Sequence, residues 1–274
     1  MTPEVVAING AQGTGKTTLA VQLRELFGER YGWHVLVLSI DDIYLHRAQR
    51  EKLAQSVHPL LRTRGVPGTH DVELGIQLLE QLGNLGTSAH PSAQQPKQPV
   101  RMPKFIKAID DRAPESDWHM VEGSVDLILF EGWCVDTPPQ EQEELREPVN
   151  ELEAREDADG TWRRYVNQQL ATVYPRLFAR IDKTIFLQAP DFDSIYRWRL
   201  QQEENNADAL RSSPTLAAAA GNRSKGHIMG PEELRRFIQH YERLTRHALK
   251  LMPERADVVI ELGAGHEVLE TRFR

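Results

Sequence analysis

The sequence predicts an α/β fold in which a mostly parallel sheet carries helices on both faces. Short apolar runs rich in β-branched residues recur along the chain, and such runs are typical of buried strands. Stretches with helical spacing of apolar residues separate these runs, as a parallel sheet requires. With 274 residues, 40% of them hydrophobic, the chain is long enough to bury one sizeable core. We therefore expect a single domain over residues 1–274.

Five segments have the pattern of a buried strand, namely residues 5–8, 35–38, 125–130, 181–187 and 258–262. Amphipathic helical spacing follows the first strand, recurs at residues 72–82 and is clearest at residues 231–251. Glycine, serine, glutamine and proline dominate residues 83–100, which predicts a loop. Residues 211–230 combine an alanine run with serine and glycine, so we expect a flexible insertion there.

Composition narrows the classes of function. The net charge is −7, and an acidic chain has no overall electrostatic attraction to nucleic acid or to an anionic membrane. The single cysteine, Cys134, rules out an intrachain disulfide and a metal site built on several cysteines. No signal-peptide pattern opens the sequence and no apolar run approaches the ~20 residues that span a bilayer. We expect a cytoplasmic protein; its oligomeric state stays open.

A phosphate-binding motif follows the first predicted strand. Residues 10–17, Gly-Ala-Gln-Gly-Thr-Gly-Lys-Thr, match G-x-x-x-x-G-K-[ST] at every fixed position, between an apolar strand and an amphipathic helix. The motif predicts a P-loop NTPase fold, with Lys16 on the β- and γ-phosphates of ATP and the Thr17 hydroxyl on Mg²⁺. A dinucleotide site fits less well, because position 18 is threonine where G-x-G-x-x-G needs glycine. Nine residues are expected to bind the nucleotide: Gly10, Ala11, Gln12, Gly13, Thr14, Gly15, Lys16, Thr17 and Thr18.

Acidic residues follow two of the predicted strands directly. Asp41 and Asp42 come after the strand at 35–38, and Glu131 comes after the strand at 125–130. The carboxyl ends of strands line the ligand crevice of a parallel sheet, and buried acids there need a cation or a proton. The metal beside Thr17 needs a second acidic group, and the candidates are Asp41-Asp42 and Glu131.

Further short sequence motifs indicate to which group of P-loop proteins the chain is similar. The N-K-x-D sequence of switch GTPases and the L-S-G-G-Q sequence of transporter ATPases are both absent. Characteristic blocks include Ser39-Ile40-Asp41-Asp42-Ile43-Tyr44, Arg62-Thr63-Arg64-Gly65, Met102-Pro103-Lys104-Phe105, Phe130-Glu131-Gly132-Trp133 and Tyr196-Arg197-Trp198-Arg199. The chain resembles the kinases of uridine, pantothenate and phosphoribulose, and most closely the D-glycerate 3-kinase branch, over residues 5–268.

The resemblance implies phosphate transfer from ATP with Mg²⁺ to a hydroxyl of a small metabolite, D-glycerate first. It implies that Asp41 receives the proton of the acceptor, with Asp42 beside it as metal ligand or orienting group. It further implies that Glu131 supports Mg²⁺, so the expected metal residues are Thr17, Asp42 and Glu131. It also implies a helical lid whose arginines, Arg197 and Arg199, approach the phosphates. The catalytic residues expected on this basis are Lys16, Asp41, Arg197 and Arg199. The serine- and alanine-rich tract at 211–230 departs from the branch, which leaves the boundary of the lid open.

Basic residues near the expected cleft favour an anionic acceptor. Arg62 and Arg64 are two apart and point the same way if the backbone is extended, while Lys104, Lys107 and Arg112 form a second basic group. Arginine forks match a carboxylate bidentately, although surface charge explains any single residue as well. The candidates for binding the acceptor, an anionic hydroxy acid, are Arg62, Arg64, His70, Lys104 and Arg112.

Two other functions remain open at this point. One is a kinase with a different acceptor, such as uridine, pantothenate or a sugar phosphate. The other is an ATP-binding regulatory protein with no small-molecule acceptor. A kinase makes phosphorylated acceptor in proportion to ADP, so product analysis separates these functions.

Overall fold

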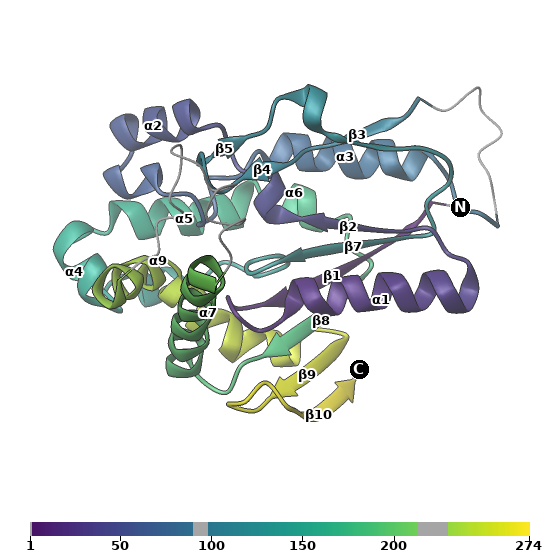
Figure 1. Ribbon diagram of the computed structural model, residues 1–274. Coiled ribbons are helices and arrows are strands. Elements are labelled where there is room, and N and C mark those ends of the chain that lie inside the picture. Colours follow the sequence, from purple (N-terminus) through teal and green to yellow (C-terminus); the bar gives the residue numbers. More distant parts are fainter. Residues whose placement is uncertain (1, 90–97, 213–229) are drawn as a thin grey trace.

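The computed structural model describes residues 2–89, 98–212 and 230–274, and Figure 1 shows them as a twisted sheet with helices packed on its faces. Within these residues the main sheet has the strand order β10-β9-β8-β1-β7-β2. Its strands are β1 (Glu4–Gly10), β2 (Val35–Ser39), β7 (Leu127–Gly132), β8 (Lys183–Gln188), β9 (Val258–Leu262) and β10 (Val268–Phe273). Neighbouring strands are parallel, except that the edge strand β10 runs antiparallel to β9. The predicted fold class is therefore confirmed.

The helices connect these strands and cover the sheet. They are α1 (Lys16–Tyr31), α2 (Arg47–Ser56), α3 (Val72–Asn84), α4 (Glu151–Glu156), α5 (Thr161–Thr172), α6 (Pro175–Phe178), α7 (Phe192–Ser212) and α9 (Pro231–Leu251). Two small ribbons lie outside the main sheet, β3 (Val100–Met102) with β6 (His119–Val121) and β4 (Phe105–Ile106) with β5 (Asp111–Arg112). Among the described helices, none combines the length and apolarity needed to cross a lipid bilayer.

The strand β7, between β1 and β2, is buried along its whole length and divides the core in two. Ile128 and Phe130 pack on one side with apolar residues of α3, α5 and α6. Leu127 and Leu129 pack on the other side with residues of α1, α7 and α9. Successive side chains of a strand point to opposite faces, so a strand covered on both faces needs the continuous apolar run seen here.

The five predicted strands are all present, with small shifts at their ends. Glu131 lies within β7, whereas the sequence suggested that it follows the strand. The two small ribbons were not predicted, because two- and three-residue strands carry too few side chains to show a period. The edge strand β10 was not predicted either, because it is exposed along its whole length and has no buried face to produce an alternating pattern. Most of the predicted insertion at 211–230 lies outside the described residues.

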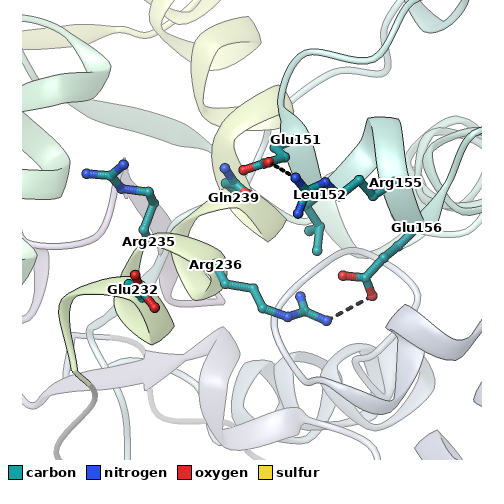
Figure 2. A pocket seen from close by; sticks show the side chains of 8 residues that line it. All are labelled: Glu151, Leu152, Arg155, Glu156, Glu232, Arg235, Arg236 and Gln239. Carbon is teal, nitrogen blue, oxygen red and sulfur yellow. Dashed lines mark hydrogen bonds and ion pairs between the residues drawn. The ribbon is translucent and has the colours of Figure 1, made fainter.

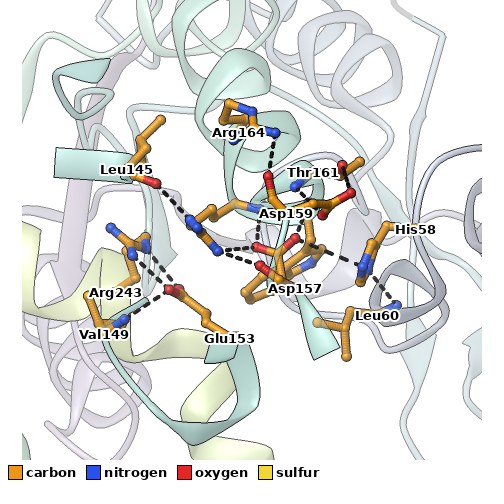
Figure 3. Close-up of polar contacts among 12 residues, drawn as sticks. His58, Leu60, Leu145, Val149, Glu153, Asp157, Asp159, Thr161, Arg164 and Arg243 are labelled. Carbon is orange, nitrogen blue, oxygen red and sulfur yellow. Dashed lines mark hydrogen bonds and ion pairs between the residues drawn. The ribbon is translucent and has the colours of Figure 1, made fainter. Parts of the chain in front are cut away.

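A buried ion pair fastens α4 to α9 (Figure 3). The Arg243 guanidinium donates to both carboxylate oxygens of Glu153, at 2.8 and 2.7 Å, and the Glu153 side chain is fully buried. Arg243 also donates to the backbone carbonyls of Glu144 and Glu147. The backbone N–H of Val149 donates to Glu153. These bonds satisfy both charges inside the protein, so removing one partner leaves the other charge buried without compensation.

We predict that Glu153→Ala lowers the free energy of unfolding by about 3–5 kcal/mol, because it leaves the Arg243 charge without its counter-charge. Urea denaturation followed by circular dichroism measures this change. Glu151→Ala is the matched control on the same helix, since Glu151 pairs with Arg155 in an exposed contact (Figure 2) and should cost about 1 kcal/mol or less. Equal losses in the two variants would contradict the prediction.

Candidate active site

The phosphate-binding loop connects β1 to α1. Gly13 and Gly15 have φ angles of 84° and 89°, a left-handed conformation that residues with a Cβ rarely adopt. A Cβ on Gly13 would also come within 3.0 Å of the Cβ of Trp198. Thr14 closes the turn, because its hydroxyl donates to the Ala11 carbonyl at 2.9 Å. The two glycines are thus required by the backbone of the loop as well as by the approach of a phosphate.

Lys16 begins α1 and lies among carboxylates. Its ammonium group donates to the Ala11 carbonyl at 2.9 Å. Burial lowers the pKa of Lys16, while the nearby charges of Glu131 and Asp41 act in the opposite direction. Lys16 therefore stands where its positive charge can meet phosphate oxygens, at the amino end of a helix whose dipole favours an anion.

The parallel register carries an acid to the phosphate-binding loop. Ile8 on β1 and Ser39 on β2 both pair with Glu131 on β7, so the ends of the three strands lie side by side. The Thr17 hydroxyl donates to Glu131 Oε1 at 3.2 Å, across 114 positions of sequence. A hydroxyl and a carboxylate meet at the point where the sequence predicted a metal.

Asp41 is held from two sides just beyond β2. Lys107 Nζ lies 2.7 Å from Asp41 Oδ2, and the Tyr44 hydroxyl donates to Asp41 Oδ1 at 2.9 Å. Burial by itself raises the pKa of Asp41, but the charge of Lys107 and the bonds from Lys107 and Tyr44 outweigh it, so the pKa lies below its ordinary value. Asp41 is thus ionised at neutral pH and held in one orientation.

Asp42 has a different environment from its neighbour. Its Oδ1 accepts the backbone N–H of Phe105 at 3.1 Å. Burial raises the pKa of Asp42, and the charge of Asp41 adds to that rise. A nearby cation would favour the ionised form, which is the property expected of a metal ligand.

These residues line a cavity of about 410 Å³ at the carboxyl ends of β1, β7 and β2. The lining residues are Gln12, Gly13, Lys16, Thr17, Ser39, Asp41, Asp42, Tyr44, Arg64, Lys107, Glu131, Gly132, Trp133, Arg199, Gln202, Phe237 and Tyr241. The phosphate-binding loop, the acids and several cations therefore share one space. Such a combination in a cleft is what phosphoryl transfer requires.

Arg64 lies in the cavity wall and is fixed by Asp110. The two side chains form an ion pair, and the Arg64 guanidinium stands 5.4 Å from the centre of the Phe105 ring. Asp110 also pairs with Arg50, at 3.0 Å between Nη2 and Oδ2, and Arg50 is completely buried. Arg64 is therefore presented to the cavity in one orientation by a network that reaches into the core.

The other predicted acceptor residues lie elsewhere. Arg62 and Lys104 have exposed side chains and are not part of the cavity lining. Arg112 is buried behind the wall, where it donates to Asp71 Oδ2 at 3.1 Å and to the Tyr44 carbonyl at 2.8 Å. Through these two hydrogen bonds Arg112 connects the β4–β5 ribbon to the loop after β2 and to Asp71.

His70 supports the cavity wall from behind. Its ring stacks on Tyr44 with centroids 4.5 Å apart, and its Nδ1 shares a hydrogen bond with the Tyr174 hydroxyl at 2.6 Å. Burial lowers the pKa of His70 to about 3, so the ring is neutral at physiological pH. A neutral ring in this place packs Tyr44 against the site without adding charge.

The two predicted lid arginines of α7 differ in position. Arg199 lines the cavity, whereas Arg197 is exposed and donates to the hydroxyl of Ser194, at 2.8 Å. Between them, Trp198 packs against Gly13 and stacks on His266, whose Nε2 lies 2.8 Å from the Gly13 carbonyl oxygen. Segment 213–229, which follows α7, lies outside the described residues.

Several lining or supporting residues were not among the predicted site residues. Asp110 adopts φ 55° in the turn of the β4–β5 ribbon, and Tyr241 and Phe237 reach the cavity from α9. Lys107 belonged to a basic group but had no assigned role. The φ angle of Asp110 is known only from the structure, and the residue type is consistent with it because aspartate is among the residues that tolerate a left-handed turn.

A second cavity, of about 500 Å³, lies between α4 and α9 (Figure 2). Its charged side chains include two ion pairs, Arg155 with Glu151 at 2.5 Å and Arg236 with Glu156 at 2.9 Å. The cavity takes its lining from these two helices and contains none of the phosphate-binding loop. Its paired charges point to a solvated groove, so the cavity at the strand ends is the candidate active site.

Comparisons with known proteins give the family. No family model matches the chain. The chain is 32% identical over 248 residues to the uncharacterized kinase mug58 of Schizosaccharomyces pombe. This alignment covers 87% of this chain and 78% of that protein. It is 30% identical over 207 residues to the chloroplastic D-glycerate 3-kinase of Arabidopsis thaliana, covering 73% of this chain and 41% of that protein. The chain thus spans about two fifths of the length of this second relative.

A solved structure agrees with these relatives. The D-glycerate 3-kinase from Cryptococcus neoformans matches with a TM-score of 0.75 and 26% identity, covering all of this chain and 90% of that one. The likeness therefore extends over the sheet, the phosphate-binding loop and the elements that surround the cavity. The chain belongs to the D-glycerate 3-kinase-like family of P-loop kinases, and it is an ATP-dependent kinase of small molecules.

Proposed function

We propose that this kinase transfers the γ-phosphate of ATP to a hydroxyl of D-glycerate. The observation that carries the proposal is the position of Arg64, a cation fixed in the wall of the cavity that also contains Asp41 and Lys16. An arginine held in this way suits a carboxylate, because its fork makes charge-assisted hydrogen bonds. The names of two relatives, each a D-glycerate 3-kinase, support the same acceptor.

The prior fixing of Arg64 favours recognition of a small acceptor. Its ion pair with Asp110 and its contact with Phe105 hold the guanidinium before a ligand arrives. A side chain that is already ordered loses less conformational entropy on binding, which matters most for a ligand with few contacts. Glycerate has one carboxylate and two hydroxyls, so a single oriented cation can determine which hydroxyl approaches Asp41.

The roles of the other residues follow from their places. Asp41, oriented by Tyr44 and Lys107, would accept the proton of the attacking hydroxyl. Lys16 would offset charge on the β- and γ-phosphates, and Arg199 would add a second positive charge from α7. Lys107, although it pairs with Asp41, is 64% exposed and could exchange this partner for an anionic oxygen of the acceptor.

The residues near Thr17 fit Mg²⁺. This ion keeps several waters and takes one or two protein carboxylates together with substrate phosphates. The Thr17 hydroxyl and Glu131 already meet at 3.2 Å, and Asp42 faces the same cavity. Bound there, the metal would neutralise charge on the phosphates of ATP. A cytoplasmic location stays a prediction from the sequence.

Asp41→Asn tests the proposed proton acceptor. An amide keeps the shape of the side chain but cannot take the proton, so we expect single-turnover phosphorylation to fall by about 10²–10⁴-fold. Affinity for Mg-ATP, measured by calorimetry, should change by no more than about threefold, which is under 1 kcal/mol. Asp117→Asn, at an exposed position, is the control for an amide substitution. Collapse of ATP binding would instead make Asp41 chiefly an organiser of the metal.

Arg64→Ala tests the acceptor. A charge-assisted hydrogen bond contributes roughly 1.5–3 kcal/mol, so kcat/KM for D-glycerate should fall about ten- to a hundredfold while Mg-ATP affinity is retained. Glycerol, which lacks the carboxylate, should be a poor substrate of the wild type and should respond little to the variant. Arg62→Ala is the comparison two residues away, and its exposed side chain predicts a smaller loss.

The same assay, extended to uridine, pantothenate and sugar phosphates under saturating Mg-ATP, separates the remaining alternatives. A higher kcat/KM for any of these than for glycerate would overturn the proposed acceptor and leave the kinase activity standing. ADP release without a phosphorylated acceptor in all cases would favour a regulatory protein.

A further inference from the structure

The strand β10 forms an outer edge of the main sheet and is exposed along its whole length (Figure 1). Three large apolar side chains on it face solvent, with Val268 61%, Leu269 59% and Phe273 79% exposed. No other strand of the main sheet carries an exposed large apolar residue in the part of the chain that the structure describes. Edge strands of this kind are ready templates for pairing with another strand.

The backbone of β10 is also arranged for such pairing. The N–H of Arg274 donates to the carbonyl of Asp257 on the inner side, at 2.9 Å. Because the direction of the backbone groups alternates along an antiparallel strand, the N–H and C=O groups of Thr271 and Phe273 point outward. An irregularity of register lies between Val268 and Glu270, so the segment beyond it is the regular part of the edge.

The sequence of this edge is complementary to itself when it is reversed. Residues 269–273 read Leu-Glu-Thr-Arg-Phe, with apolar ends, an acid and a base on either side of a central threonine. In an antiparallel pair centred on Thr271, Glu270 of each copy would lie opposite Arg272 of the other, which gives two such pairs. The same pairing would also bring Phe273 toward Leu269. Opposite charges in directly facing positions stabilise a strand pair, and like charges destabilise it.

Two neighbouring registers that also keep outward backbone groups facing each other bring like charges together. A two-fold axis through Glu270 would place two glutamates face to face, and one through Arg272 would do the same with two arginines. The axis through Thr271 joins outward-pointing N–H and C=O groups and separates all like charges. Self-pairing about Thr271 therefore satisfies the backbone and the side chains together.

We propose that β10 pairs with β10 of a second copy of this chain, antiparallel and about a two-fold axis at Thr271, so that the two sheets become continuous. The pairing is isologous and closes as a dimer. None of the residues that line the active-site cavity lies on β10, so both sites stay open. The inference does not depend on the identity of the acceptor.

The contact is short, so the dimer is a weak one. Interfaces that bury less than about 1,200 Å² belong to the transient class, and we expect a dissociation constant on the order of 10 µM. The charges of Glu270 and Arg272 supply the selectivity, because a partner strand without the complementary order meets unpaired or like charges. Within one chain Arg272 contacts Glu270 at 3.3 Å and Glu261 at 3.6 Å, and because these ion pairs are exposed they contribute little and can be shared with the partner strand.

The test uses charge reversal and mixing. Sedimentation equilibrium of the full chain between about 1 and 200 µM spans the expected dissociation constant and measures the dimer fraction. Arg272→Glu leaves two acids on the edge of each copy, and Glu270→Arg leaves two bases. Each variant alone should therefore associate at least about tenfold more weakly than the wild type. An equimolar mixture of the two restores both opposite-charge pairs and should form a heterodimer with near wild-type affinity.

Arg155→Glu provides the matched control, because it changes the net charge equally on the exposed α4, at the far end of the molecule from β10 (Figure 1). It should associate as the wild type does, and all variants should retain kinase turnover. The two reversals on β10 should lower the melting temperature only slightly, because the ion pairs of Arg272 within the chain are exposed. A wild type that stays monomeric at 200 µM, about twenty times the expected dissociation constant, overturns the inference. So does a dimer that is insensitive to Arg272→Glu, or a mixture that fails to associate.

Discussion

The parallel pairing of β1, β7 and β2 is the constraint on which the active site depends. Their register places Ile8, Glu131 and Ser39 in one row, so the segments that follow the three strands leave the sheet at the same edge. The phosphate-binding loop, Glu131 and the two aspartates thereby meet although they are far apart in sequence. A shift of one residue would turn Glu131 to the other face of the sheet and separate it from Thr17.

The side of the cavity that contains Arg64 is built in a different way, around a buried arginine. Arg50 donates to the carbonyls of Leu45, Arg62 and Asp110 and pairs with the Asp110 carboxylate. A buried guanidinium needs all of these acceptors, so it holds three loops in fixed relation. The contacts of Arg50 with Asp110 therefore fix the turn between β4 and β5. This turn positions Lys107 beside Asp41 and Asp110 beside Arg64.

The charges inside the cavity explain how an acidic protein can bind the phosphates of ATP. Four cations line it, Lys16, Arg64, Lys107 and Arg199, together with three acids, Asp41, Asp42 and Glu131. The net charge of −7 is therefore distributed away from the phosphate and acceptor region. Local potential in a cleft governs ligand approach more than the charge of the whole chain does.

The sequence by itself determined those features that are written in consecutive residues. The phosphate-binding loop, the buried strands and the helix at α9 follow from local pattern, because glycine geometry and apolar periodicity act over a few positions. Asp41, Asp42 and Glu131 were placed together because strand ends share one edge in a parallel sheet. These predictions needed only the order of strands and helices.

Only the tertiary structure decided how the basic residues are divided. Arg64 lines the cavity, Arg112 forms an ion pair with Asp71 behind the cavity wall, and Arg62 is exposed to solvent. In the sequence these three arginines could not be told apart. The partner of a long charged side chain is set by folding contacts tens of residues away, as Asp110 shows for Arg64. The same holds for β10, whose open edge depends on its pairing with β9 and not on its own composition.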